Sequence, residues 1–355
     1  MRFKKQVLFT GVALAATGLI SCSNPKPECT VGQSGFPTQG FAVRYIVKDN
    51  PNSCPVMTGE IVGMQSYHPA KDGDEQNRDF SKTKIAMRTQ SSGELYWMIE
   101  DWYGRDSPEA LAAQPNAEGD FAAAEPDATD FCQVPTITEA RVNFPGVSYD
   151  LGAPCTTNEE CVELTAAPSA TCQEVSDVGD MSCVVDYAPT EMAYRWTNVQ
   201  VYVTAAALGT QFKADVEIEI NGCSASYTAV GLWPAIDCTD YYGAVDAQGN
   251  VFEDPTFAPD VRLCNPEPDP EGAEPPGNEG AVSSQRRVFG SGINPDFGPT
   301  QCDGAVAVHP VIDQYYLDFN GFARTTPLCT LATEEIPALG GYTPAGGAGG
   351  AGGGQ

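Results

Sequence analysis

Apolar and polar residues alternate in two adjacent stretches, Ala214–Ile220 and Cys223–Val230, which are separated only by Asn221-Gly222. A two-residue Asn-Gly turn between alternating runs predicts a β-hairpin, because both turn residues must take positive φ. One face of this hairpin is apolar and the other polar, as expected where one face covers a core and the other is wet. The predicted opposite pairs are Ile220 with Cys223, Ile218 with Ala225 and Val216 with Tyr227, and on the polar face Glu219, Glu217 and Asp215 with Ser224, Ser226 and Thr228.

Other apolar-rich or alternating runs predict the remaining elements. Ser107–Gln114 is the one helical turn we expect, because Ser107 is a favoured N-cap and Pro108 suits the first helical position. We predict a mainly β fold, with antiparallel, sandwich-like sheets, a disulfide-rich insertion and little helix. The predicted strands are Phe41–Val47, Glu60–Tyr67, Lys84–Arg88, Glu94–Tyr103, Ala193–Ala205 and Gln314–Phe319.

The first residues have the order of a secretory signal. Arg2, Lys4 and Lys5 precede an apolar stretch, Val7–Ile20, that is shorter than the roughly 20 residues of a spanning helix. The run Leu-Ile-Ser-Cys that ends at Cys22 resembles the lipobox of bacterial lipoproteins. That resemblance implies cleavage before Cys22, a diacylglycerol on its thiol and a further acyl chain, such as palmitate, on its amine. Two or three acyl chains hold a protein at a bilayer almost permanently, whereas one holds it only marginally.

The residue after Cys22 bears on the membrane that receives the anchor. In Gram-negative lipoproteins an Asp at this position implies inner-membrane retention, so Ser23 favours the outer membrane. We therefore expect a protein that is lipid-anchored through Cys22 in the outer membrane of the cell envelope. It would face either the periplasm or the cell surface.

The charge balance narrows the choice of partners. Residues 1–21 hold three of the 19 basic groups and no acid, which leaves 16 basic and 47 acidic residues, a balance of −31. Such a surface repels phosphate backbones and anionic head groups, so we expect no nucleic-acid partner. An envelope protein or a glycan remains a possible partner.

Twelve cysteines remain once Cys22 is set aside, an even number in an exported chain. No C-x-x-C pair occurs, and only His68 and His309 could supply imidazole, so the spacing does not suit structural zinc. Cysteines in an exported protein indicate disulfides, and we expect six. The cysteines concerned are Cys29, Cys54, Cys132, Cys155, Cys161, Cys172, Cys183, Cys223, Cys238, Cys264, Cys302 and Cys329.

Four of these cysteines crowd the stretch 155–183 with the spacing C-x5-C-x10-C-x10-C. Few apolar residues lie between them, so disulfides must supply the order that a core supplies elsewhere. Our preferred pairing is Cys155–Cys172 with Cys161–Cys183, although four cysteines allow three connectivities and the sequence cannot choose among them. The segment is interpreted either as a recognition finger or as a stapled, protease-resistant surface loop.

Several phrases of the sequence resemble a family of uncharacterised, Cys-rich outer-membrane lipoproteins of myxobacterial type. These phrases are PCTTNEEC, RWTNVQVYVTAAALGTQF, NGCSASY, WPAIDC and GSGINPDF. The likeness extends over most of residues 22–331. The resemblance implies the fold and the cellular location, and it implies no particular activity.

Motifs for catalysis are mostly missing from the sequence. A serine hydrolase would show G-x-S-x-G, a zinc protease H-E-x-x-H and a phosphate-binding loop G-x-x-x-x-G-K-[ST], and none of these occurs. Carboxylate-only chemistry stays open, because a glycosidase needs just two acids about 5–10 Å apart. Glu100 and Asp101, beside Trp97 and Trp102, are the candidates, since aromatic residues next to acids suit a sugar platform.

Two acidic loops are candidates for calcium, which takes six to eight oxygen ligands. The first contains Asp72, Asp74 and Asp79, and the second contains Asp246 and Asp254. Neither has the EF-hand spacing. We expect no other cofactor.

We hypothesise that the protein is a non-catalytic binding or structural module of the envelope. The alternatives are a tethered carboxylate hydrolase acting on polysaccharide and a calcium-stabilised adhesion domain. We divide the chain into 1–21 signal peptide, 22–40 tether, 41–150 β region with an acidic loop, 151–190 Cys-rich insertion, 191–264 β region with the Asn-Gly hairpin, 265–290 Pro/Gly/acidic linker, 291–339 C-terminal β segment and 340–355 disordered Gly/Ala tail.

Overall fold

A computed structural model places most of the chain. The structure describes residues 27–32, 40–72, 74–176 and 179–240, together with 244–245, 251–252, 258–259, 261–264, 293, 300–306, 310–320 and 326–337. The expected signal peptide, Cys22, the linker 265–290 and the Gly/Ala tail lie outside the described residues.

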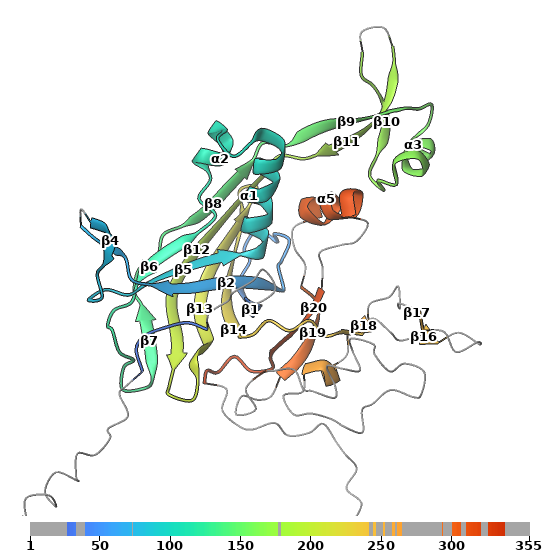
Figure 1. The fold of residues 1–355 in the computed structure, drawn as a ribbon. Coiled ribbons are helices and arrows are strands. Elements are labelled where there is room, and N and C mark those ends of the chain that lie inside the picture. The colour runs from blue at the N-terminus through green and yellow to red at the C-terminus, as the bar shows by residue number, and fades with distance from the viewer. Residues whose placement is uncertain are drawn as a thin grey trace, which may run out of the picture.

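A nine-stranded antiparallel sheet forms the body of the molecule (Figure 1). Its order is β6-β5-β2-β1-β14-β13-β12-β7, and β8 also pairs with β12, beyond the end of the β7 pairing. The bounds are β1 Phe41–Asp49, β2 Gly59–Tyr67, β5 Lys84–Thr89, β6 Ala117–Asp120, β7 Phe131–Val134, β8 Ala140–Phe144, β12 Thr190–Val203, β13 Leu208–Ile220 and β14 Cys223–Leu232.

The predicted Asn-Gly hairpin is confirmed. Asn221 and Gly222 have φ of 51° and 78°, and they join β13 to β14. Ile220 lies opposite Cys223, Ile218 opposite Ala225 and Val216 opposite Tyr227, in the predicted register. Register is therefore fixed locally, by a turn that only permissive residues can form.

The prediction of a strand at Glu94–Tyr103 is wrong, because this stretch belongs to α1, Gln90–Tyr103. The Thr89 hydroxyl caps the helix by accepting from the Ser92 amide. Leu95, Met98 and Ile99 are buried against the sheet, at the i, i+3, i+4 spacing of a helix. The short helix α2, Pro108–Ala112, forms where a helical turn is predicted, with the Ser107 side chain as its N-cap.

The predicted strand at Gln314–Phe319 is also wrong, because the chain forms α5, Pro310–Asn320. Val311, Ile312, Tyr315 and Tyr316 are buried and recur with helical period. This helix lies next to α1 (Figure 1). In both cases a run of aromatic and branched residues suggests β-structure, but its period is that of a helix.

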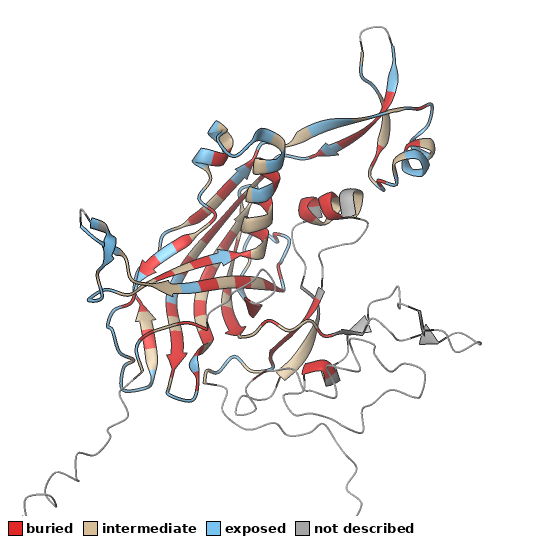
Figure 2. Cartoon of the chain, in the orientation of Figure 1, coloured by how far each residue is buried: buried red, intermediate tan, exposed pale blue. Residues whose placement is uncertain are grey.

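The core of the sheet is aromatic. The rings of Phe41 and Phe212 meet edge to face with centroids 5.3 Å apart, and Trp196 packs on Phe212 at 6.4 Å. A Cβ at Gly231 would lie 2.1 Å from the Phe212 ring, so only glycine fits beneath it. Figure 2 shows that buried residues run along the strands of this sheet.

Smaller elements complete the fold. The three-stranded sheet β10-β11-β9 is formed by β9 Val147–Pro154, β10 Thr171–Glu174 and β11 Met181–Tyr187, with α3 Asn158–Thr165 beside it. The other pairs are β3 Ala70–Lys71 with β4 Asp74–Arg78, β15 Thr239–Asp240 with β18 Ala258–Pro259, β16 Ala244–Val245 with β17 Val251–Phe252 and β19 Thr300–Val306 with β20 Thr326–Leu331, and η1 is a 3-10 turn at Val261–Cys264. The prediction of a mainly β, antiparallel fold with a disulfide-rich insertion is confirmed.

Among the described residues, no helix has both the length and the apolar character needed to span a bilayer.

Candidate recognition site: the finger

Residues 147–187 project from the sheet as a separate arm, which we name the finger (Figure 1). It starts and ends at one point, where Val147 lies opposite Tyr187 in the β9–β11 ladder. The ladder extends outward through Ser148 and Asp186, and β10, β11 and α3 form the tip. The predicted Cys-rich insertion is thus a continuous excursion that enters and leaves the sheet region at adjacent positions.

Two disulfides organise the tip. The bonds are Cys155–Cys172 and Cys161–Cys183, which is the pairing preferred from the sequence. Cys172 and Cys183 lie directly opposite each other in the β10–β11 ladder, yet each is bonded to a different partner. The hairpin is therefore tied to the end of β9 on one strand and to α3 on the other. The sulfurs of Cys155, Cys161 and Cys172 lie within 4.8 Å of one another and form the centre of the tip.

Local hydrogen bonds set the start of α3. The Thr157 hydroxyl accepts from the Glu160 amide at 3.2 Å, and the Glu160 carboxylate accepts from the Thr156 amide and hydroxyl, both at 2.8 Å. Donation from Thr156 lowers the pKa of Glu160. At the other end Ala166 takes a left-handed φ of 57° and closes the helix.

The base of the finger is clamped by α5. The Asp318 carboxylate accepts from the Tyr187 hydroxyl at 2.9 Å, from the Ser169 amide at 3.0 Å and from the Ser169 hydroxyl. Burial, followed by the charge of Asp318, raises the pKa of Tyr187, which therefore stays a neutral donor. One carboxylate thus joins α5 to β11 and to the loop between α3 and β10.

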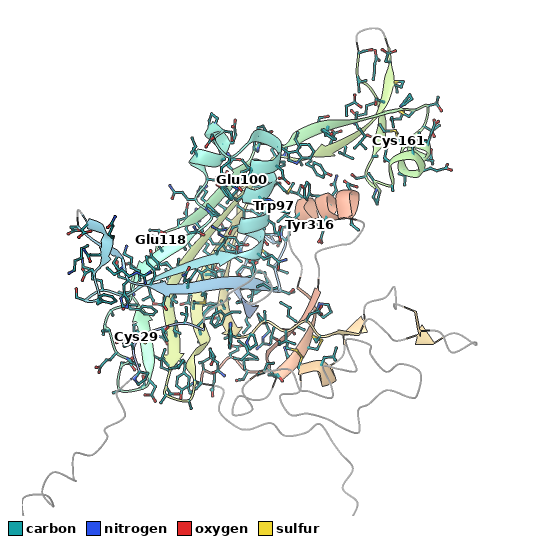
Figure 3. All side chains as sticks on the ribbon, in the orientation of Figure 1. Cys29, Trp97, Glu100, Glu118, Cys161 and Tyr316 are labelled. Carbon is teal, nitrogen blue, oxygen red and sulfur yellow. A yellow bond between two sulfur atoms is a disulfide. The ribbon has the colours of Figure 1, made fainter. Side chains whose placement is uncertain are left out.

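The same helix is also bound to α1. The Tyr315 hydroxyl donates to Asp101 at 2.8 Å, and the Tyr316 hydroxyl donates to Glu94. Figure 3 shows Tyr316 on α5 beside α1. Trp102 of α1 packs on Tyr149 of the finger with ring centroids 4.8 Å apart. The finger is therefore held at its base by aromatic packing and hydroxyl–carboxylate bonds, and it is not a freely swinging loop.

A shallow depression of about 400 Å³ lies at this base. Its polar side chains are few, and they include those of Ser148, Asp186 and Tyr187. The lining residues are Pro145, Gly146, Val147, Ser148, Asp186, Tyr187, Ala188 and Pro189.

The surface of the finger differs from the rest of the chain. Residues 147–187 contain eight acids and no Lys, Arg or His. They also carry five of the twelve large apolar side chains that are exposed in the described part of the chain: Tyr149, Val162, Leu164, Val175 and Met181. Figure 2 shows the outer side of α3 as exposed. This combination is typical of a binding surface rather than of a packed one.

The hydrolase candidates lie on α1 but do not face each other. Glu100 accepts from the Tyr96 hydroxyl at 3.1 Å and pairs with Arg105 at 2.9 Å, whereas Asp101 accepts from Tyr315. Consecutive helical residues point about 100° apart, so each acid serves its own partners. Trp97 is 48% exposed, and Trp102 packs at the base of the finger.

The calcium candidates that the structure describes are bound within their own loops. Asp74 accepts from the Gln76 amide at 3.2 Å and from Asn77, and Asp79 accepts from the Ser81 amide and hydroxyl. Asp72 is exposed, and among the described residues no group of three carboxylates converges on one point. Asp246 and Asp254 lie outside the described residues, as does His309, while His68 contacts the Lys82 carbonyl at 2.9 Å.

The other four disulfides join distant parts of the chain. Cys29–Cys132 ties the first described residues to β7, and Cys54–Cys223 links the loop after β1 to β14. Cys238–Cys302 and Cys264–Cys329 hold the C-terminal β19–β20 pair, whose Cys302 and Cys329 again lie opposite each other. All twelve cysteines proposed for disulfides are therefore paired in the structure.

Our reading of the sequence missed a buried acid, Glu60 of β2, which is fully enclosed in the core. Its carboxylate accepts from the hydroxyls of Tyr45 and Tyr194 at 2.9 and 2.8 Å, and from the Ser91 amide at 2.8 Å. Burial raises the pKa of Glu60. The signal was available, because Glu60 shares the apolar face of its strand with Val62 and Met64.

Comparison with known proteins agrees with the resemblance read from the sequence. The family model MlpA matches residues 39–234, which include all nine strands of the large sheet and the whole finger. A Myxococcus xanthus protein named "Putative lipoprotein MlpA" is 41% identical over 51 residues, which are 14% of this chain and 22% of that protein. No solved structure matches. The resemblance to myxobacterial lipoproteins is confirmed, and the chain belongs to the MlpA family.

Proposed function

We propose that this protein is an acylated lipoprotein of the outer membrane that presents the finger, as a non-catalytic binding module, to a partner in or on the cell envelope. The observation that carries this proposal is the position of the finger relative to the start of the described chain. Cys29 lies at one end of the molecule and Cys161, at the tip of the finger, lies at the other (Figure 3).

The short tether would determine which end of the molecule lies near the bilayer. Cys29 follows Cys22 by seven positions, and seven extended residues span at most about 25 Å. The Cys29–Cys132 disulfide fixes the end of the tether to β7. An acylated Cys22 would therefore hold the β7 end of the sheet near the bilayer and leave the finger directed away from it.

The contacts at the base support a presenting role. A protruding two-stranded ribbon is marginally stable when it stands alone. Here Asp318, Tyr187 and Trp102 fix the ribbon to α5 and α1. An arm that is stiffened at its base and exposed at its tip loses little conformational entropy when it binds.

The anchor is tested by acyl labelling. Radiolabelled palmitate should be incorporated into the wild-type protein, which should partition into detergent, whereas Cys22→Ser should show neither property. Equal partitioning of both proteins would contradict the anchor.

The finger is tested by site-specific photo-crosslinking in cells. A photo-reactive amino acid at Leu164, on α3, should give a discrete protein or glycan adduct. The matched control is Leu111 on α2, which is even more exposed, at 75% against 57%, and should give none. No adduct from Leu164, or the same adduct from both positions, would contradict a recognition role.

A further inference from the structure

We infer that the partner of the finger is a protein surface that carries Lys or Arg side chains around a small apolar patch. This inference rests on the proposed function and adds the chemistry of the partner to it. Three features of the finger carry it: a charge of a single sign, apolar side chains among those charges, and carboxylates that are spread out.

The charge is the first feature. The eight acids of the finger are Asp150, Glu159, Glu160, Glu163, Glu174, Asp177, Asp180 and Asp186, and no base lies between Arg141 and Arg195. Within the described residues no Lys or Arg pairs with a finger carboxylate, whereas Arg195 alone pairs with three carboxylates on the sheet. Among the described residues the negative charge of the finger is therefore not neutralised by a base, and a basic surface would be attracted to it and oriented by it.

The apolar side chains are the second feature. Val162 and Leu164 are 39% and 57% exposed on α3, on either side of Glu163 in the sequence. Val175, directly after β10, and Met181, the first residue of β11, are exposed as well. Apolar groups surrounded by charges resemble the centre and rim of a protein–protein interface. A purely cationic polymer would leave these groups in water.

The spread of the carboxylates is the third feature. Glu160 is bound to Thr156 and Asp150 to Ser182, while Glu159, Glu163 and Glu174 are exposed on α3 and β10. Only cysteines form a three-residue cluster of possible metal ligands in this described segment. Because no trio of described acids converges in the finger, the arrangement suits several separate cations on a broad surface better than one metal ion.

The test compares two triple variants that remove the same charge from different places. The finger variant is Glu159→Gln with Glu163→Gln and Glu174→Gln. The control variant is Asp72→Asn with Asp106→Asn and Asp130→Asn, three exposed acids outside the finger. The probe is a fluorescent peptide of alternating lysine and leucine, titrated against the purified, disulfide-intact protein at physiological salt.

We expect the finger variant to weaken binding of this peptide about tenfold, from three exposed ion pairs of about 0.5 kcal/mol each. The control variant should weaken it less than about twofold. Leu164→Ser should also weaken binding, with no change in salt dependence, while Leu111→Ser should not. Equal losses in both triple variants would mean adsorption to any acidic surface and would overturn the inference, as would no loss in the finger variant.

The cellular photo-crosslink separates the failure of this inference from the failure of the proposed function. If Leu164 gives an adduct that survives in the finger variant, the finger binds a partner but the partner is not selected by positive charge. If Leu164 gives no adduct in the wild-type background, the proposed function itself fails. An adduct that is lost in the finger variant and retained in the control variant supports both.

Discussion

The nine-stranded sheet and the finger solve the problem of stability in different ways. In the sheet, aromatic side chains such as Phe41, Trp196 and Phe212 fill a continuous core. On its polar face, Arg195 binds Glu139, Glu217 and Glu219. The finger has neither a large apolar core of its own nor any base, and two disulfides and a clamp at its base replace them.

The difference indicates what each region is for. The sheet neutralises part of its charge within the chain and buries large side chains such as those of Tyr194 and Tyr227. The finger leaves acids and apolar groups on its surface and depends on covalent bonds for its order. We expect a region built in this way to contribute little to the stability of the sheet and to be available for contact with another molecule.

The largest expected effect is on the sheet. Phe212→Ala should lower the free energy of unfolding by about 3–5 kcal/mol, because it removes a fully buried ring from the aromatic core. The midpoint of thermal or denaturant unfolding measures this loss. Leu164→Ser on the finger should change the midpoint hardly at all, and an equal loss in both variants would remove the distinction between the regions.

The next effect is confined to the finger. Cys161→Ser with Cys183→Ser removes a cross-link that closes a loop of 22 residues. In the chain-entropy model this loss lowers the free energy of unfolding of the tip by about 3 kcal/mol. Amide exchange at the tip should accelerate by about a hundredfold, while exchange in β12 and β13 stays unchanged. Acceleration in the sheet as well would show that the two regions unfold together.

A smaller effect is expected at the clamp. Asp318→Asn removes a charged acceptor from Tyr187 and Ser169. It should lower the free energy of local opening at the base of the finger by about 1–2 kcal/mol. The readout is faster exchange around Ser169 with the tip disulfides intact. Asp106→Asn, at an exposed acid outside the finger and α5, is the control. Unaltered exchange at Ser169 in Asp318→Asn would mean that α5 does not position the finger.

The smallest effect is a difference in pH response. Hydrogen bonds from the Ser182 hydroxyl and the Gly152 amide lower the pKa of Asp150 from its ordinary value of about 3.8. Ionised Asp150 therefore stabilises the finger fully at pH values above this ordinary pKa, and the stabilisation is lost as pH falls through the lowered pKa. Burial raises the pKa of Glu60 above about 4.5, so its contribution to the sheet is present at low pH and is lost as pH rises through the raised pKa.

Acidification should therefore weaken protection in the finger relative to the sheet. Protection factors at pH 3 and pH 6, compared with those of Asp150→Asn and Glu60→Gln, measure the two contributions separately. A parallel response of both regions, unchanged by either substitution, would contradict the assignment.

The parts of the fold that obey local rules could be predicted from the sequence. The Asn221-Gly222 turn fixes its own register, and a dense cysteine segment in an exported chain indicates a stapled insertion. The strand predictions at α1 and α5 failed because aromatic and branched residues outweighed the helical period that Leu95, Met98 and Ile99 display. The Asp318 clamp could not be predicted from the sequence. Asp318 is 131 positions from Tyr187 and 149 positions from Ser169, and their contact depends on how α5 packs.

The most direct test replaces residues 149–185 with a two-residue Asn-Gly turn between Ser148 and Asp186, which are already opposite each other in the ladder. We expect this variant to fold with a sheet as stable as that of the wild type and to remain at the membrane. Its binding of the lysine–leucine peptide should be reduced at least as far as in the finger variant. Collapse of the sheet, or binding that persists at full strength without the finger, would contradict the account.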